Sequence, residues 1–157
     1  MLEPAVRDAL RARLDTSRAA LLVSLEGVTE RDFGVTLNGD SGGGETVVQA
    51  LAALAFAERL ATADAAGETV ADRTVERPLP PQVVHALAGA RYRTQRYLDS
   101  PEATAETAET LVAALEARER EAAARIEARP RLAPPPVFPM VEPRGPQPGE
   151  PPRNFVP

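Results

Sequence analysis

The first stretch of this 157-residue sequence that suggests chemistry is residues 39–43, which read GDSGG. These letters match both the motif of chymotrypsin-like proteases and the G-x-S-x-G pattern of hydrolases. A nucleophilic serine needs an activating base, a third group that orients the base, and a β-barrel or strand–turn–helix setting. The neighbouring sequence has helical spacing instead. We therefore interpret residues 39–43 as a flexible loop and assign Ser41 no catalytic role.

Metal and phosphate chemistry is limited by what the composition lacks. The chain has no cysteine, a single histidine, and no lysine among its 18 basic residues. Thiolate ligands, disulfides and multi-histidine metal sites are therefore excluded. A Walker loop needs a lysine, so the glycines at 42–44 are interpreted as a loop without a phosphate. We expect no catalytic residue, no metal and no cofactor.

The candidate binding residues lie on two segments with helical spacing. His85 neighbours Val84 and Leu87, which favours a partly buried packing position. Arg91 and Tyr92 belong to a basic and aromatic cluster on the same segment, which also holds the following residues: Arg93, Arg96 and Tyr97. Such a cluster suits an anionic ligand or partner, although helix-surface arginines commonly only cover apolar surface. An altered enzyme site would require Glu58, His85 and a carboxylate of the last helix to converge in one pocket.

A proline-rich segment occupies residues 130–157 and holds 11 of the 16 prolines. Proline fixes φ and lacks an N–H, so we expect extended or irregular chain here and place the domain boundary at 129/130. The segment also carries a few large apolar side chains: Val137, Phe138, Met140 and Phe155. They could anchor the segment on its own bundle, on a sister subunit or on another protein. A purely solvating tail is the alternative.

The remaining sequence predicts four helices, because apolar residues recur at steps of three and four. We expect them at residues 4–26, 47–63, 82–99 and 101–129, with a short helical turn near 29–33. Thr46 and Gln49 have the spacing of a capping box, Gly27 fits a helix C-terminus, and Ser100-Pro101 resembles the start of the last helix. Each helix has one apolar stripe, so the chain is expected to form an all-α four-helix bundle.

The last helix carries many glutamates and arginines at spacings of three and four. These pairs predict a solvated face held by weak surface ion pairs. Glu116 and Glu119 resemble the carboxylate ligands of helical di-iron proteins, but such sites also use Glu-x-x-His pairs. None exists in this sequence. We therefore place both glutamates on the solvated face.

The sequence resembles the DinB/YfiT-like superfamily over about residues 5–128. The likeness rests on residues 14–25, the turn at 28–30, the glycine loop and the segment TVVQALAAL at 46–54. The resemblance implies a four-helix bundle that is often dimeric. It also implies, for many members, a divalent metal held by three histidines and used in thiol transfer or hydrolysis.

The histidines of that family are missing from this chain. The first ligand position corresponds to Ala53, the remaining pair corresponds to the vicinity of Arg118 and Ala122, and His85 matches none of them. Without imidazoles there is no evident Lewis acid to activate a water or thiol. The resemblance therefore implies a divergent member with a degenerate metal site.

Three functions follow as expectations. The preferred one is a non-catalytic binding or interaction subunit that contacts a protein partner or a second copy through the bundle and the proline-rich tail. The alternatives are a metal-dependent thiol S-transferase or hydrolase with an altered site, and a carrier of a small ligand inside the bundle.

The net charge of −5 and pI near 5.0 argue against nucleic acid as a partner. Finding no apolar run long enough for a membrane span and no secretory signal pattern, we expect a cytoplasmic protein. The arginine and alanine bias suggests a bacterial source.

Overall fold

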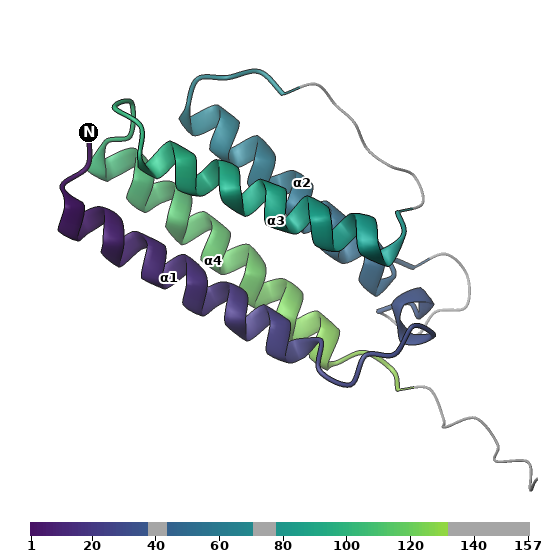
Figure 1. Ribbon diagram of the computed structural model, residues 1–157. Coiled ribbons are helices and arrows are strands. Elements are labelled where there is room, and N and C mark those ends of the chain that lie inside the picture. Colours follow the sequence, from purple (N-terminus) through teal and green to yellow (C-terminus); the bar gives the residue numbers. More distant parts are fainter. Residues whose placement is uncertain (38–43, 71–77, 132–157) are drawn as a thin grey trace, which may run out of the picture.

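The structure is a computed structural model that describes residues 1–37, 44–70 and 78–131 (Figure 1). The described part of the chain forms four α-helices and one short 3₁₀ turn: α1 (Pro4–Ser24), η1 (Asp32–Gly34), α2 (Val47–Ala65), α3 (Pro80–Leu98) and α4 (Ala105–Glu127). Within those residues the only β pairing is an isolated bridge between Thr36 and Thr46. The all-α prediction is confirmed. The GDSGG loop and the apolar tail residues 137, 138, 140 and 155 lie outside the described residues.

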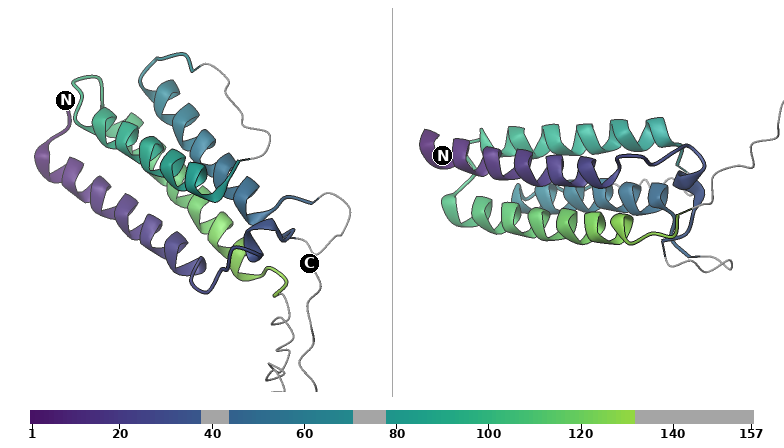
Figure 2. Two further views of the ribbon diagram at one scale, coloured as in Figure 1. Left: turned by 45° about the vertical axis from the view of Figure 1, so that its right-hand side comes forward. Right: turned by 90° about the horizontal axis from the view of Figure 1, so that it is seen from below.

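The helices pack lengthwise as a bundle (Figures 1 and 2). Helix α1 packs on α4, and α2 packs on both α3 and α4. Polar groups join α1 to the C-terminal end of α3, where the Arg11 guanidinium donates to the Asp99 carboxylate at 2.5 Å. None of the described helices combines the length and the apolar character needed to cross a membrane.

The helix ends follow the local sequence in most places. Gly27 and Gly67 follow α1 and α2 with φ of +74° and +69°, values that glycine adopts without a steric penalty. The capping box at the start of α2 is confirmed: the Gln49 N–H donates to Thr46 Oγ1 at 3.3 Å, and the Thr46 N–H donates to Gln49 Oε1 at 2.9 Å. Helix α3 begins at Pro80, two residues before the predicted start, because the fixed φ of proline suits the first helical turn.

The predicted start of α4 is wrong by four residues. Ser100 does not cap this helix, because its buried hydroxyl accepts no N–H, and its own N–H donates to the Tyr97 carbonyl of α3 at 2.9 Å. Thr104 is the capping residue, and its hydroxyl accepts from the Thr107 N–H at 3.2 Å. The predicted end at residue 129 is also slightly late, since α4 ends at Glu127.

Buried aliphatic side chains form two clusters toward opposite ends of the bundle. The first apolar cluster draws on all four helices and includes Leu21, Leu51, Leu54, Leu87 and Ile126. The second apolar cluster lies nearer the N-terminus and includes Leu10, Leu14, Leu98, Leu111 and Leu115. The sequence periodicity also predicts inward positions for Val6, Leu60 and Val84, but these three side chains are exposed. They lie beside the apolar stripes that the two clusters define.

Candidate functional site

Four charged side chains cross the bundle between the two apolar clusters, one from each helix. They are Arg18 of α1, Glu58 of α2, Arg91 of α3 and Glu119 of α4, and we call them the charged layer. Each replaces an apolar residue in the inward stripe of its helix; Arg18, for instance, lies four residues after Leu14 and three before Leu21. Helical periodicity therefore turns all four toward the bundle axis.

The charged layer is a closed set of four ion pairs. Arg18 donates from Nη2 to Glu58 Oε2 and from Nε to Glu119 Oε1, both at 2.6 Å. Arg91 donates from Nε to Glu58 Oε1 at 2.9 Å and from Nη2 to Glu119 Oε1 at 2.6 Å. Each guanidinium thus contacts both carboxylates, and the two positive charges balance the two negative ones.

Two threonines and a backbone carbonyl extend this network. The Thr94 hydroxyl lies 3.0 Å from Glu58 Oε1, within hydrogen-bond distance, and 2.9 Å from the hydroxyl of Thr62. Arg18 Nη1 donates to the Leu87 carbonyl at 3.3 Å. Both oxygens of Glu58 therefore accept hydrogen bonds, which a buried carboxylate requires.

Burial determines what the charged layer contributes to folding. The side chains of Glu58 and Glu119 are 1% and 2% exposed, and those of Arg91 and Arg18 are 9% and 15% exposed. Removing four charges from water costs several kcal/mol per ion, which their mutual attraction only approximately offsets. Removing one member leaves an unbalanced charge in the core. The layer thus favours one arrangement of the four helices more than it adds stability.

Two polar atoms of the charged layer are left without a partner in the described structure. They are Arg91 Nη1, a donor, and Glu119 Oε2, an acceptor, and both are shielded from solvent. Buried polar groups are nearly always satisfied by protein or by ordered water. On its α3 and α4 side, the charged layer can therefore form two more hydrogen bonds. Arg91 Nη1 can donate to one acceptor, and Glu119 Oε2 can accept from one donor.

The structure brings together only two of the four predicted binding residues. Glu58 and Arg91 meet in the charged layer, whereas His85 is exposed on α3 and the Tyr92 side chain is 60% exposed. Tyr97 points elsewhere again, because it is buried in the second apolar cluster. The basic and aromatic residues of α3 thus face different directions. The grouping of Glu58 and His85 with an α4 carboxylate is also not formed, since only Glu58 and Glu119 meet.

Placing Glu119 on a solvated face is wrong, because its side chain is buried between Arg18 and Arg91. The sequence analysis does not single out Arg18, because the small Ser17 beside it also fits the gap in the apolar stripe between Leu14 and Leu21. The sequence does contain a signal for the charged layer. One charged residue interrupts the apolar stripe of each helix, and the four charges alternate between positive and negative along the chain. The rest of the predicted solvated face holds for Arg118, Arg120, Glu121 and Glu127, which are exposed.

The residues present do not fit a metal centre at the positions that the family resemblance implies. Ala53 and Arg118 are exposed, and Ala122 is buried among aliphatic side chains. Among the described residues, no three or more histidine, cysteine, aspartate or glutamate side chains gather as a metal would require. Glu58 and Glu119 do meet, but the guanidinium groups already occupy three of their four oxygens.

A second arginine–glutamate group lies one turn away on the surface of α1 and α4. Arg13 Nη2 donates to Glu116 Oε2 and Nη1 donates to Glu109 Oε1, both at 2.6 Å; we call these three residues the surface cluster. The Arg13 side chain is 37% exposed. The hydrogen bond from Arg13 holds the pKa of Glu116 below its ordinary value, and the carboxylates raise the pKa of Arg13 in turn.

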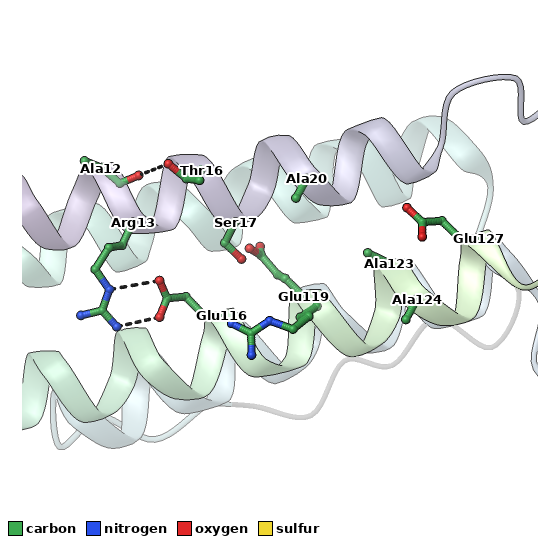
Figure 3. A pocket seen from close by; sticks show the side chains of 11 residues that line it. Ala12, Arg13, Thr16, Ser17, Ala20, Glu116, Glu119, Ala123, Ala124 and Glu127 are labelled. Carbon is green, nitrogen blue, oxygen red and sulfur yellow. Dashed lines mark hydrogen bonds and ion pairs between the residues drawn. The ribbon is translucent and has the colours of Figure 1, made fainter.

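A groove of about 600 Å³ runs between α1 and α4, beside the charged layer (Figure 3). Its lining combines small residues with charged ones: Ala12, Arg13, Thr16, Ser17, Ala20, Glu116, Glu119, Arg120, Ala123, Ala124 and Glu127. In Figure 3 the Glu119 carboxylate points from α4 toward Ser17 on α1. The groove therefore lies over a carboxylate of the charged layer.

Comparison of the chain with protein-family models, with curated proteins and with solved structures found no match. Function is therefore inferred from the side chains themselves.

Proposed function

We propose that this protein is a DinB-like helical bundle that acts as a non-catalytic binding subunit with a lost metal site, and that the charged layer is part of its interior in place of such a site. The observation that carries the proposal is the closed set of four ion pairs between Arg18, Glu58, Arg91 and Glu119. Cofactor and metal sites of helical bundles are built from inward-facing side chains on different helices. Here the inward-facing charged side chains of the four helices form a group whose charges balance one another.

The chemistry of the charged layer supports binding over catalysis. A guanidinium stays protonated in proteins and is a poor general acid or base. Both carboxylates already accept charge-assisted hydrogen bonds from it, and such bonds are strong. A general base must have a free lone pair within reach of the proton it removes. Within the charged layer only Glu119 Oε2 has a free lone pair, and this atom is shielded from solvent.

A metal-dependent thiol S-transferase or hydrolase with an altered site is the second candidate. The observation in its favour is the meeting of Glu58 and Glu119, two carboxylates from α2 and α4, inside the bundle. A divalent ion bound between them would have to displace Arg18 and Arg91 or tolerate two positive charges within hydrogen-bond distance of its ligands. That arrangement is electrostatically costly in a medium of low dielectric constant.

Elemental analysis of the purified protein separates these candidates. The protein is purified without chelator, incubated with Zn²⁺, Ni²⁺ and Mn²⁺ in turn, and desalted before inductively coupled plasma mass spectrometry. The binding subunit is expected to retain far less than one ion per chain. One ion per chain, lost in Glu58→Gln but retained in the exposed control Glu121→Gln, would favour the enzyme.

The contact role of the proline-rich tail and the formation of a homodimer belong to the same proposal. They are supported by the large apolar residues Val137, Phe138, Met140 and Phe155 in the proline-rich segment, and by the family resemblance. Light scattering on the full chain measures the assembly directly. We expect a dimer mass that falls when these four residues are replaced by serine. A monomer in both cases would contradict this part of the proposal.

A further inference from the structure

The groove between α1 and α4 carries two opposite charges that have no ion pair within the described residues. They are Arg120 and Glu127, which both belong to α4 and are both exposed. The other charges of the lining, Arg13, Glu116 and Glu119, are already paired. Arg120 and Glu127 lie seven residues apart, about 10 Å along the helix axis, which is too far for them to pair with each other.

These two charges are placed symmetrically about a pair of alanines. The midpoint between Arg120 and Glu127 falls between Ala123 and Ala124, which also line the groove. A second α4 can be laid antiparallel on the first, with a two-fold axis at this midpoint. Arg120 of each copy then meets Glu127 of the other copy. The surface is therefore complementary in charge to itself.

We propose that the groove binds a second copy of this chain, so that the two α4 helices pack antiparallel in a two-fold symmetric dimer. Each copy offers the same surface to the other, as in most homodimers. This inference rests on the homodimer of the proposed function and deepens it, because it names the surface of the bundle through which the two copies bind.

The small side chains of the groove allow the two helices to approach closely. The distance between packed helix axes depends on the side chains at the contact, and here these are Ala123 and Ala124 of both copies. On the α1 side, Ala20 faces the same groove (Figure 3). Val23 lies three residues after Ala20, on the same side of α1, and is 58% exposed. A second copy seated in the groove covers this apolar side chain.

The two charges select the antiparallel orientation. In a parallel pair of α4 helices with the alanines aligned, Arg120 would lie against Arg120 of the second copy, and Glu127 against Glu127. Like charges placed against each other in an interface are costly, whereas complementary charges fix its register. The antiparallel pair forms two ion pairs instead, one on each side of the two-fold axis.

Sedimentation velocity of the full chain over a range of concentrations tests the proposal. We expect the unmodified protein to dimerise, and the dissociation constant of the dimer to rise about tenfold in Arg120→Glu and in Glu127→Arg, because each change creates two like-charged contacts. The double variant restores opposite charges at both contacts and should dimerise like the unmodified protein. Arg118→Glu makes the same change on another side of α4, where Arg118 is exposed, and should have no effect.

Mixing the two single variants gives the sharpest result. Arg120→Glu carries two glutamates at the contact positions and Glu127→Arg carries two arginines, so each repels itself and attracts the other. Native mass spectrometry of the mixture should therefore show mainly the heterodimer. The control mixture of Arg118→Glu with Glu127→Arg should show no such preference. Circular dichroism checks that every variant keeps its helices.

Three results overturn the proposal: a monomeric unmodified protein, single variants that dimerise as tightly as the unmodified protein, or a mixture without preference for the heterodimer. The proposed function fails separately. A dimer that is insensitive to both charge changes but is lost with the four tail residues would leave the tail contact standing. Retention of one metal ion per chain would contradict the non-catalytic binding subunit, whatever the state of assembly.

Discussion

The charged layer and the surface cluster are made of the same two residue types and lie about one helical turn apart, yet burial gives them different roles. Arg13 reaches two glutamates with its side chain 37% exposed, whereas Arg91 reaches two glutamates with its side chain 9% exposed. Water screens the first group and competes for its hydrogen bonds. The second group is shielded from water, so the charge of each member must be balanced by the others. Ion pairs of similar length therefore contribute differently to the free energy of unfolding when one group is exposed and the other is buried.

The largest expected effect comes from opening the charged layer. Arg91→Met leaves Glu58 and Glu119 with one guanidinium between them, so the core holds a net negative charge. Breaking a buried pair in this way costs about 3–5 kcal/mol of unfolding free energy. Urea denaturation measures the loss. The exposed Arg93→Met on the same helix serves as the control and should stay within about 0.5 kcal/mol of the unmodified protein.

Replacing the whole charged layer by apolar residues should act in the opposite direction. The variant Arg18→Met, Glu58→Leu, Arg91→Met and Glu119→Leu removes all four desolvation costs and joins the two apolar clusters. We expect stability to be unchanged or to rise by about 1–4 kcal/mol, as for other buried ion-pair groups. A loss larger than that of Arg91→Met alone would mean that the layer is a net stabilising element, contrary to this account.

Breaking the surface cluster should matter much less. Arg13→Ala removes both of its ion pairs, and we expect a loss of about 0.2–1 kcal/mol at low salt. The same comparison at about 1 M salt should give a smaller loss, because the Debye length is then short. Urea denaturation at both salt concentrations checks this. A loss as large as that of Arg91→Met would remove the distinction between the two groups.

The smallest effect is a pH dependence of the surface cluster. Arg13 lowers the pKa of Glu116 in the folded protein relative to the unfolded chain, for which 4.5 is the ordinary value. A group with a lowered folded pKa contributes its stability above the unfolded pKa and loses it as pH falls through the folded value. The stability difference between the unmodified protein and Glu116→Gln should therefore shrink below pH 4.5. A difference that grows on acidification would contradict the assignment.

Helices and their ends could be predicted from the sequence because they depend on neighbours. The capping box at Thr46 and the glycine after α1 are set by residues within one or two turns of each helix end. The start of α4 is harder to predict, because both Ser100 and Thr104 are residue types that cap helices. Ser100 stays bonded to α3 and Thr104 caps α4. Which of them caps the helix depends on the turn between α3 and α4, and the local sequence does not show this.

The charged layer could not be predicted from any one helix. Helical periodicity is consistent with inward positions for Glu58 and Arg91, yet a single glutamate or arginine among charged neighbours, as at Glu119, is more often solvated. Its burial becomes reasonable only when Arg18 of α1 stands opposite at the same level of the bundle. That requires the mutual rotation and offset of the helices, which tertiary packing sets. Complementary charges in the apolar stripes of different helices do indicate a charged layer, but they do not give the contacts within it.

The most direct test of the central claim is a crystal structure with anomalous diffraction data collected at the nickel and zinc edges after incubation with both ions. The account predicts guanidinium groups of Arg18 and Arg91 between the carboxylates of Glu58 and Glu119, and no anomalous peak within the charged layer. An anomalous peak between the two carboxylates, with the arginines displaced, would contradict it.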